Sequence, residues 1–222
     1  MKLSGLFAAV FACALVSYGP AMGDPPPPAP SGPVVASPAI DGDMTIGSAT
    51  AKVEIIEYAS LACPHCAEWH TTVWDQLKAN YIDTGKIRFT LREFPTAAPA
   101  DIVLAEFQVA RCGGATASEY FDRVAIMMRE RETIFSTLTR EGIHQQLIAM
   151  GARFGLSQQQ VDACIQDQAG ANRFNQATAR GEHDIVGTPS FFIDGVRSDN
   201  FQDWATYDAF AHTIDAEIAR RH

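Results

Sequence analysis

Two cysteines separated by two residues give this sequence its clearest chemical signal. The run Cys63-Pro64-His65-Cys66 follows a stretch typical of a β-strand and opens one typical of a helix. At the start of a helix, unpaired backbone N–H groups and the positive end of the dipole stabilise a thiolate. Cys63 would occupy that position, and Cys66, one turn on, could close a disulfide with it. The pattern predicts thiol–disulfide exchange.

The two residues between the cysteines suit this chemistry. Pro64 fits the first helical position because its missing N–H would be unpaired there anyway. His65, when protonated, adds positive charge beside the Cys63 sulfur. A low pKa makes Cys63 a good leaving group and its disulfide oxidising. The alternative is an inert structural disulfide, although two cysteines three apart on a helix strain the bond and make it reducible.

Metal and haem sites need partners that this sequence does not supply near the pair. A zinc site takes about four ligands, and the chain has no second close Cys pair and no His-x-x-x-His. Covalent haem attachment needs His after the second cysteine, where Ala67 stands. A binding module in which the thiols capture a soft metal such as copper stays open, although no Met or His cluster adjoins Cys63. We expect no cofactor and no resident metal.

Glu57 stands six positions before Cys63, in the strand-like run of residues 53–58. Strand parity places it on the same face as Val53 and Ile55, so a sheet covered on both sides would bury its carboxyl group beneath the cysteines. Burial disfavours the charged form of a carboxyl group, which suits a relay for the proton of Cys66. The alternative is a solvated position at a strand edge.

A Gly-Thr-Pro turn precedes an aromatic, strand-like run at residues 190–193. Proline cannot donate to a sheet ladder, and a cis Thr188–Pro189 bond would expose the backbone of Thr188 to a substrate strand. Taken alone, a Gly-Thr-Pro sequence more often marks an ordinary turn than a catalytic one. Its pairing with Cys-x-x-Cys favours a place for Thr188 and Pro189 in the catalytic site.

The remaining cysteines, histidines and large aromatic residues carry weaker signals. Cys112 and Cys164 are either two buried apolar residues or a structural disulfide, and we expect the disulfide. The isolated histidines are expected at the surface, and the aromatic residues in the core or a groove. These residues are His70, His144 and His183, and Trp69, Trp74, Tyr81 and Trp204.

The elements that must position these groups begin after an export signal. Residues 1–23 combine Lys2, an apolar run and small residues at a cleavage site; an uncleaved membrane anchor and a lipidated Cys13 are the alternatives. Residues 24–40 form a proline-rich linker. Export places the other four cysteines in a compartment where disulfides persist.

Strand signals at residues 53–58, 86–94 and 190–193 are separated by helical ones. A helix is expected over 63–82, helices alone between 99 and 183, and a last helix at the C-terminus. This order predicts an α/β domain, residues 41–97 and 184–222, interrupted by an all-helical insertion, 98–183. The composition, 47% hydrophobic and 19% charged, suits a globular chain, and the net charge of -9 excludes a nucleic-acid partner.

Three segments together resemble the DsbA-like branch of the thioredoxin superfamily: residues 57–66, 92–95 and 187–195. The resemblance covers the chain from about Asp43 onward and implies a thioredoxin fold with a helical insertion. It implies that Cys63 is the exposed nucleophile, Cys66 the resolving thiol, Glu57 the buried acid and Pro189 a cis-proline.

The resemblance also implies a periplasmic oxidase that donates its disulfide to unfolded or reduced secreted proteins and is reoxidised by a DsbB-like, quinone-linked membrane partner. Thr188 departs from the best-known oxidases, which carry valine there, and threonine is also found in disulfide isomerases. An isomerase or reductase therefore remains the alternative. Those isomerases resemble V-shaped dimers, and the stretch before Asp41 is too short and proline-rich for a dimerisation domain, so we expect a monomeric oxidase.

Overall fold

The computed structural model describes residues 41–181 and 185–221. The predicted signal peptide (residues 1–23) and linker (24–40), with Cys13 and His183, lie outside the described residues. In the part that is described, no helix is both long and apolar enough to cross a membrane.

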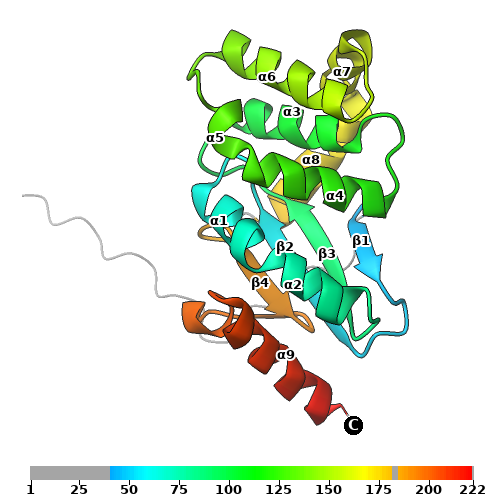
Figure 1. The fold of residues 1–222 in the computed structure, drawn as a ribbon, viewed down its shortest axis with the longest axis vertical. Helices are drawn as coiled ribbons and strands as arrows, with labels where there is room; N and C mark the ends of the chain where they lie inside the picture. The colour runs from blue at the N-terminus through cyan, green and yellow to red at the C-terminus, as the bar shows by residue number, and fades with distance from the viewer. Residues whose placement is uncertain (1–40, 182–184, 222) are drawn as a thin grey trace, which may run out of the picture. The chain divides into compact units, whose positions relative to one another are not determined.

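A mixed sheet with the strand order β1-β3-β2-β4-β5 forms the frame of the fold (Figure 1). The central strands β2 and β3 are parallel, and the other pairs are antiparallel. Both central strands are buried at every position except the second, Glu54 and Arg88, as expected of apolar strands covered on two faces. The strands are β1 (Met44–Gly47), β2 (Val53–Ala59), β3 (Ile87–Glu93), β4 (Ser190–Ile193) and β5 (Val196–Arg197).

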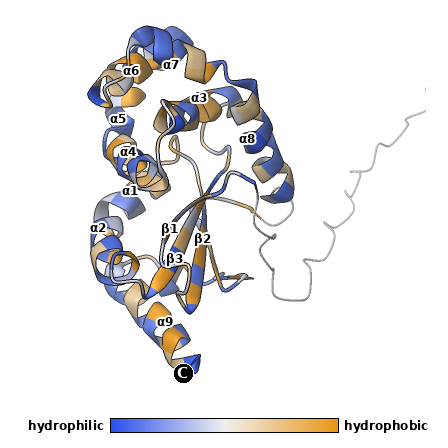
Figure 2. Ribbon diagram, turned by 90° about the vertical axis from the view of Figure 1, so that its right-hand side faces the viewer, coloured by the Kyte–Doolittle hydropathy of each residue, from blue (hydrophilic) through white to orange (hydrophobic). Residues whose placement is uncertain are grey.

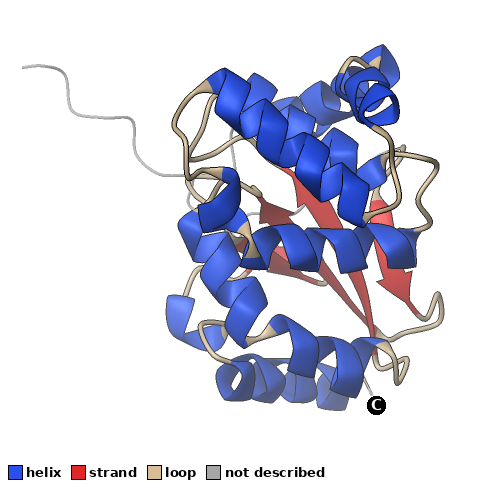
Figure 3. Ribbon diagram, turned by 45° about the horizontal axis from the view of Figure 1, so that its top comes forward, coloured by secondary structure: helices blue, strands red, loops and turns tan. Residues whose placement is uncertain are grey.

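Helices pack on both sides of this sheet. Figure 2 shows α1, α2 and α9 on one side and α8 on the other, and Figure 3 shows the strands behind a layer of helices. Among the described residues between β3 and β4, where the sequence predicts only helices, the structure has six helices. The helices outside that block are α1 (Pro64–Thr72), α2 (Trp74–Leu77) and α9 (Tyr207–Arg220); those within it are α3 (Ala100–Arg111), α4 (Ala117–Arg129), α5 (Arg131–Ile134), α6 (Arg140–Arg153), α7 (Gln158–Ile165) and α8 (Gln168–Gly181).

The helix predicted over residues 63–82 is not continuous. It breaks at Val73, where φ is -115°, and continues as α2 and a π-helical turn, Lys78–Ile82. Just before the break, the hydroxyls of Thr71 and Thr72 donate to carbonyls four residues back. Such bonds bend helices, which accounts for the interruption.

Strand β1 was not predicted from the sequence. It is four residues long and pairs with the edge of β3, where the Thr45 and Thr90 hydroxyls lie 2.8 Å apart. Gly47 ends it at a φ of +93°, and a Cβ there would lie 2.3 Å from the Ile87 carbonyl oxygen. A strand this short shows no period, so only its pairing identifies it.

One apolar core joins the sheet to the helical block. Phe89 of β3 packs edge-to-face on Phe121 of α4, and Trp74 stacks on the same Phe121. Capping boxes at Thr116–Glu119 and Ser157–Gln160 start α4 and α7 where the sequence predicts them. The division at 97/98 and 183/184 remains our proposal for the two parts.

Candidate active site

Cys63 caps the N-terminus of α1, with Pro64 in the first turn. Both Cys63 and Cys66 are free thiols in the structure. Cys66 is fully buried, and Cys63 is only 5% exposed. The expectation of an exposed Cys63 is therefore wrong for the free protein, because the loop that carries Thr188 closes over its sulfur.

The two thiols have opposite electrostatic environments. The hydrogen bond from Cys66, opposed by burial, lowers the pKa of Cys63 from 9.0 to about 5, and Thr188 and the backbone N–H groups of Cys66 and His65 contribute. Burial is the largest cause that raises the pKa of Cys66 well above its usual range. The hydrogen bond to Cys63 and the charge of Glu57 raise it further. The site therefore holds one thiolate and one thiol at neutral pH.

His65 acts on Cys63 through its backbone. Its side chain is exposed, and Nδ1 lies 3.9 Å from the carboxylate of Glu68. The added positive charge that the sequence suggests for this imidazole remains a prediction.

The loop before β4 lies against Cys63. The Thr188–Pro189 peptide bond is cis, and Sγ of Cys63 lies 3.2 Å from the Thr188 carbonyl oxygen, to which the thiol donates when it is protonated. The Thr188 hydroxyl bonds that of Thr96, whose carbonyl accepts from Ser60 at 2.8 Å. Thr96, in the loop after β3, has no motif in the sequence that could have singled it out.

Glu57 is fully buried on β2, and its partner is His70. Nε2 of His70 lies 3.1 and 3.0 Å from the two carboxylate oxygens, and the ring is 1% exposed. The expectation that His70 is a surface residue is wrong. The missed signal is the helical period, since His70 follows Cys66 by four residues and shares its face of α1.

Arg131 is a second residue that the sequence did not single out. It begins α5, and its Nε donates to the carbonyl oxygen of Ala62 at 2.5 Å. That carbonyl belongs to the peptide bond before Cys63. The helical block therefore contributes a polar contact to the active-site turn.

A groove of about 560 Å³ opens beside Cys63, between α1 and the loops on either side of β4 and β5. Its wall includes Trp69, Pro189 and Trp204. Val186 and Phe201 also line it and are 96% and 57% exposed. The site thus pairs a reactive sulfur with an apolar surface large enough for an extended peptide.

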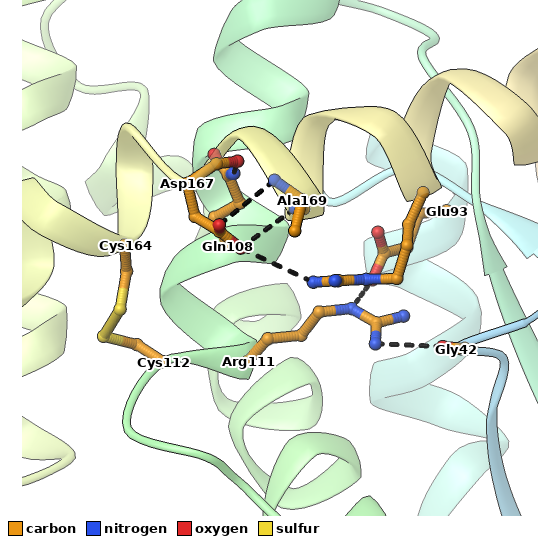
Figure 4. Close-up of polar contacts among 10 residues, drawn as sticks. Gly42, Glu93, Gln108, Arg111, Cys112, Cys164, Asp167 and Ala169 are labelled. Carbon is orange, nitrogen blue, oxygen red and sulfur yellow. Dashed lines mark hydrogen bonds and ion pairs between the residues drawn. A yellow bond between two sulfur atoms is a disulfide. The ribbon is translucent and has the colours of Figure 1, made fainter.

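The remaining predicted residues lie elsewhere. Cys112 and Cys164 are joined by a disulfide with Cα atoms 5.7 Å apart, linking the end of α3 to α7. Figure 4 shows it beside Arg111, whose Nε donates to Glu93 at 2.5 Å and whose Nη1 donates to the Gly42 carbonyl at 3.0 Å. The structural role of the Cys112–Cys164 disulfide stays a prediction.

The other ring side chains divide between core and surface. Trp69, Trp74 and Tyr81 are buried, and His144 is partly exposed and 2.7 Å from Asp162. Among the described residues, no group of three or more His, Cys, Asp or Glu side chains is placed to hold a metal ion.

Comparison with known proteins gives one consistent family. The family model described as Thioredoxin matches residues 40–216. A protein of Rickettsia conorii is 32% identical over 185 residues, which cover 80% of this chain and 61% of that protein. A protein of Rickettsia prowazekii is 33% identical over 163 residues, which cover 72% of this chain and 57% of that protein. Both are provisionally named protein-disulfide oxidoreductases. This chain therefore spans about three fifths of their length.

Solved structures show the same fold. Wolbachia pipientis alpha-DsbA1 has a TM-score of 0.71 at 23% identity, covering 82% of this chain and 94% of that one. Oxidised BdbD from Bacillus subtilis has a TM-score of 0.70 at 17% identity, covering 84% and 98%. The predicted fold class, a thioredoxin fold with a helical insertion, is confirmed.

Proposed function

Because this chain belongs to the DsbA-like branch of the thioredoxin superfamily, we propose that it is a protein disulfide oxidase acting through Cys63 and Cys66. The observation that carries the proposal is the contrast between the two thiols, one with a pKa lowered to about 5 and one with a raised pKa. A stabilised Cys63 thiolate favours the reduced form, so the disulfide is readily given away.

The reaction is two successive thiol–disulfide exchanges. A substrate thiolate attacks Sγ of Cys63, the Cys63–Cys66 bond breaks, and Cys66 leaves and takes up a proton. A second substrate thiolate then attacks the substrate sulfur of the mixed disulfide, and Cys63 leaves as the thiolate. The substrate loses two electrons and gains a disulfide, while the enzyme becomes the dithiol.

The groove supports an unfolded chain as the substrate. Its apolar wall and the exposed Val186 and Phe201 suit apolar side chains of an extended segment. An extended substrate would lie along the Thr188 backbone, with its cysteine beside Cys63. The substrate class is thus reduced, unfolded secreted proteins.

The proposed location follows from the export signal, and the proposed partners follow from the resemblance to the DsbA-like branch. Cleavage after residue 23 would release the enzyme into the periplasm, and an uncleaved signal would anchor it to the membrane. Reoxidation would come from a DsbB-like, quinone-linked membrane protein, and the enzyme would act as a monomer.

The test is disulfide transfer to a reduced, unfolded secreted protein, measured by its regain of activity. The oxidised enzyme should transfer its disulfide, and Cys63→Ser should abolish transfer. Equilibration with glutathione should leave the pair mostly reduced, whereas a mostly oxidised pair would favour a reductase. Faster repair of a scrambled protein by the reduced enzyme would favour an isomerase, the alternative to which Thr188 points.

A further inference from the structure

Glu57 and His70 form an acid–base pair closed off from solvent. The carboxyl group is fully buried, the imidazole is 1% exposed, and Nε2 lies about equally far, 3.1 and 3.0 Å, from the two carboxyl oxygens. Among the described residues, Nδ1 of His70 is buried without a hydrogen-bond partner. This asymmetry determines where the proton of the pair sits.

A neutral ring carries its proton on Nε2, since only that nitrogen faces an acceptor. The N–H then donates to both oxygens of a carboxylate. Adding a proton to the ring would leave a buried Nδ1–H without an acceptor, which is unfavourable. The geometry therefore favours a neutral His70 that donates to an ionised Glu57.

The charge of Glu57 acts on Cys66, which shares a helix face with the carboxyl group's partner, His70. Cys66 and His70 are one turn apart on the inner face of α1, above β2. Burial raises the pKa of Cys66, and the charge of Glu57 raises it further. Cys66 is therefore a thiol that must lose a proton before it attacks, beside a buried carboxylate that can accept one.

We propose that His70 is a positioning residue that keeps Glu57 as the base for Cys66 when the Cys63–Cys66 disulfide forms. In that step Cys66 attacks Sγ of a mixed disulfide on Cys63, the new S–S bond forms and the partner sulfur leaves as a thiolate. The Cys66 proton passes to Glu57. This inference deepens the proposed function and rests on it.

No other ionisable group described near Glu57 is placed to position its carboxyl group as His70 does. From α4, Tyr120 faces it with a pKa that burial raises well above its usual range, and the charges of Glu93 and Glu57 raise it further. The Tyr120 hydroxyl donates to Glu93, which Arg111 pairs. At the N-terminus of α1, the remaining ionisable group is the Cys63 thiolate.

The residues that pair with Glu57 in the neighbouring strands carry no charge. Its partners in β3 and β4 are Leu91 and Phe191, which do not titrate. In the part of the chain that is described, His70 alone donates to the Glu57 carboxyl group.

The test follows the mixed disulfide directly. Reduced protein is treated with oxidised glutathione, and the adduct on Cys63 is followed by mass spectrometry as a function of pH. Cys66→Ser, which cannot resolve the adduct, gives the spectrum of the trapped state. The variants are His70→Leu, which removes the donor, His70→Asn, whose amide is too short to reach, and His70→Gln, whose amide can replace Nε2–H.

At neutral pH, His70→Leu and His70→Asn should resolve the adduct at least about tenfold more slowly than the wild type, as expected when a general base is lost. Raising the pH should restore the rate, and His70→Gln should stay close to the wild type. If His70→Leu does not fold, the Asn and Gln pair makes the same comparison. His144→Leu, in the helical block, is the matched control and should behave as the wild type.

A double-mutant cycle separates positioning from general damage. If His70 acts through Glu57, adding His70→Leu to Glu57→Gln should cause no further loss. If the rate losses of His70→Leu and Glu57→Gln multiply in the double variant, the inference is wrong. It is also wrong if His70→Asn keeps the pH dependence of the wild type. A wild-type protein that never forms the Cys63–Cys66 disulfide would instead refute the proposed function.

Discussion

At the scale of residues, Cys63 and Cys66 show how three positions in a chain can separate two chemically identical groups. Cys63 meets the N-terminus of α1 and accepts hydrogen bonds as a thiolate, whereas Cys66 faces the buried carboxylate of Glu57. The Cys63 sulfur lies against Thr188, which lines the groove. Cys63 should therefore react with thiol reagents much faster than Cys66.

Selective alkylation tests this division. Reduced protein treated with iodoacetamide at about pH 6 should be labelled at Cys63, since its pKa of about 5 leaves it a thiolate there, while Cys66 stays protonated. Peptide mapping by mass spectrometry identifies the labelled residue. Equal labelling, or preference for Cys66, would contradict the assignment.

The low pKa of Cys63 also predicts how stability depends on pH. The pKa is about 5 in the folded reduced protein against an ordinary 9.0, so the unfolded chain binds the extra proton between these values and stability rises with pH there. The thiolate contribution is complete above about pH 9 and lost below about pH 5. The reduced form should exceed the oxidised form in stability at about pH 8 and lose that advantage near pH 4.

Urea unfolding of both forms measures this difference. The Cys112→Ala/Cys164→Ala background restricts the redox change to the active-site pair. A more stable oxidised form at about pH 8 would point to a reductant instead.

At the scale of elements, the sequence predicts what is local. The cysteine pair, Glu57 and the Thr188–Pro189 turn lie in short windows next to strands with clear apolar patterns, and the resemblance to the DsbA-like branch is confirmed. Thr96 and Arg131 act through contacts across the fold, which no period or motif in one chain reveals. His70 was recoverable, because its spacing from Cys66 already places it on the inner face.

Strand β1 illustrates what a sequence pattern cannot show. Its place depends on Gly47, where a Cβ would meet the Ile87 carbonyl oxygen at 2.3 Å. Gly114→Ala is a matched control, because Gly114 also has a positive φ, +72°, but nothing within 4 Å of a Cβ. The control should lose roughly 1–2 kcal/mol from backbone strain, and Gly47→Ala clearly more.

Urea unfolding of the two glycine variants decides the point. An excess loss in Gly47→Ala measures the clash with β3. Equal losses would mean that β1 moves aside at little cost and that its pairing contributes little to the fold.

At the scale of the whole molecule, the Cys112–Cys164 bond ties α3 to α7 across a separation of 52 residues. Chain-entropy reasoning gives up to about 4 kcal/mol for closing such a loop. Cys112→Ala/Cys164→Ala should therefore lower the melting temperature, by up to roughly 8–16 °C for a chain of this size. Disulfide transfer by Cys63 should persist, since neither cysteine contacts the active site.

Calorimetry and the transfer assay check the two halves of this prediction separately. An unchanged melting temperature would remove the stabilising role. A transfer rate that falls with the bond, at a temperature where the protein is folded, would show that the bond takes part in function.

The contact from Arg131 to the Ala62 carbonyl has a consequence for recombination between related genes. A helical block that only covered the sheet could be exchanged between related genes without loss. Because Arg131 of α5 instead donates to the peptide bond before Cys63, recombination that replaces this block also replaces a hydrogen-bond donor to the catalytic turn. Chimeras should therefore work best when the incoming segment brings an arginine at this position, and the two portions of the gene should be inherited together.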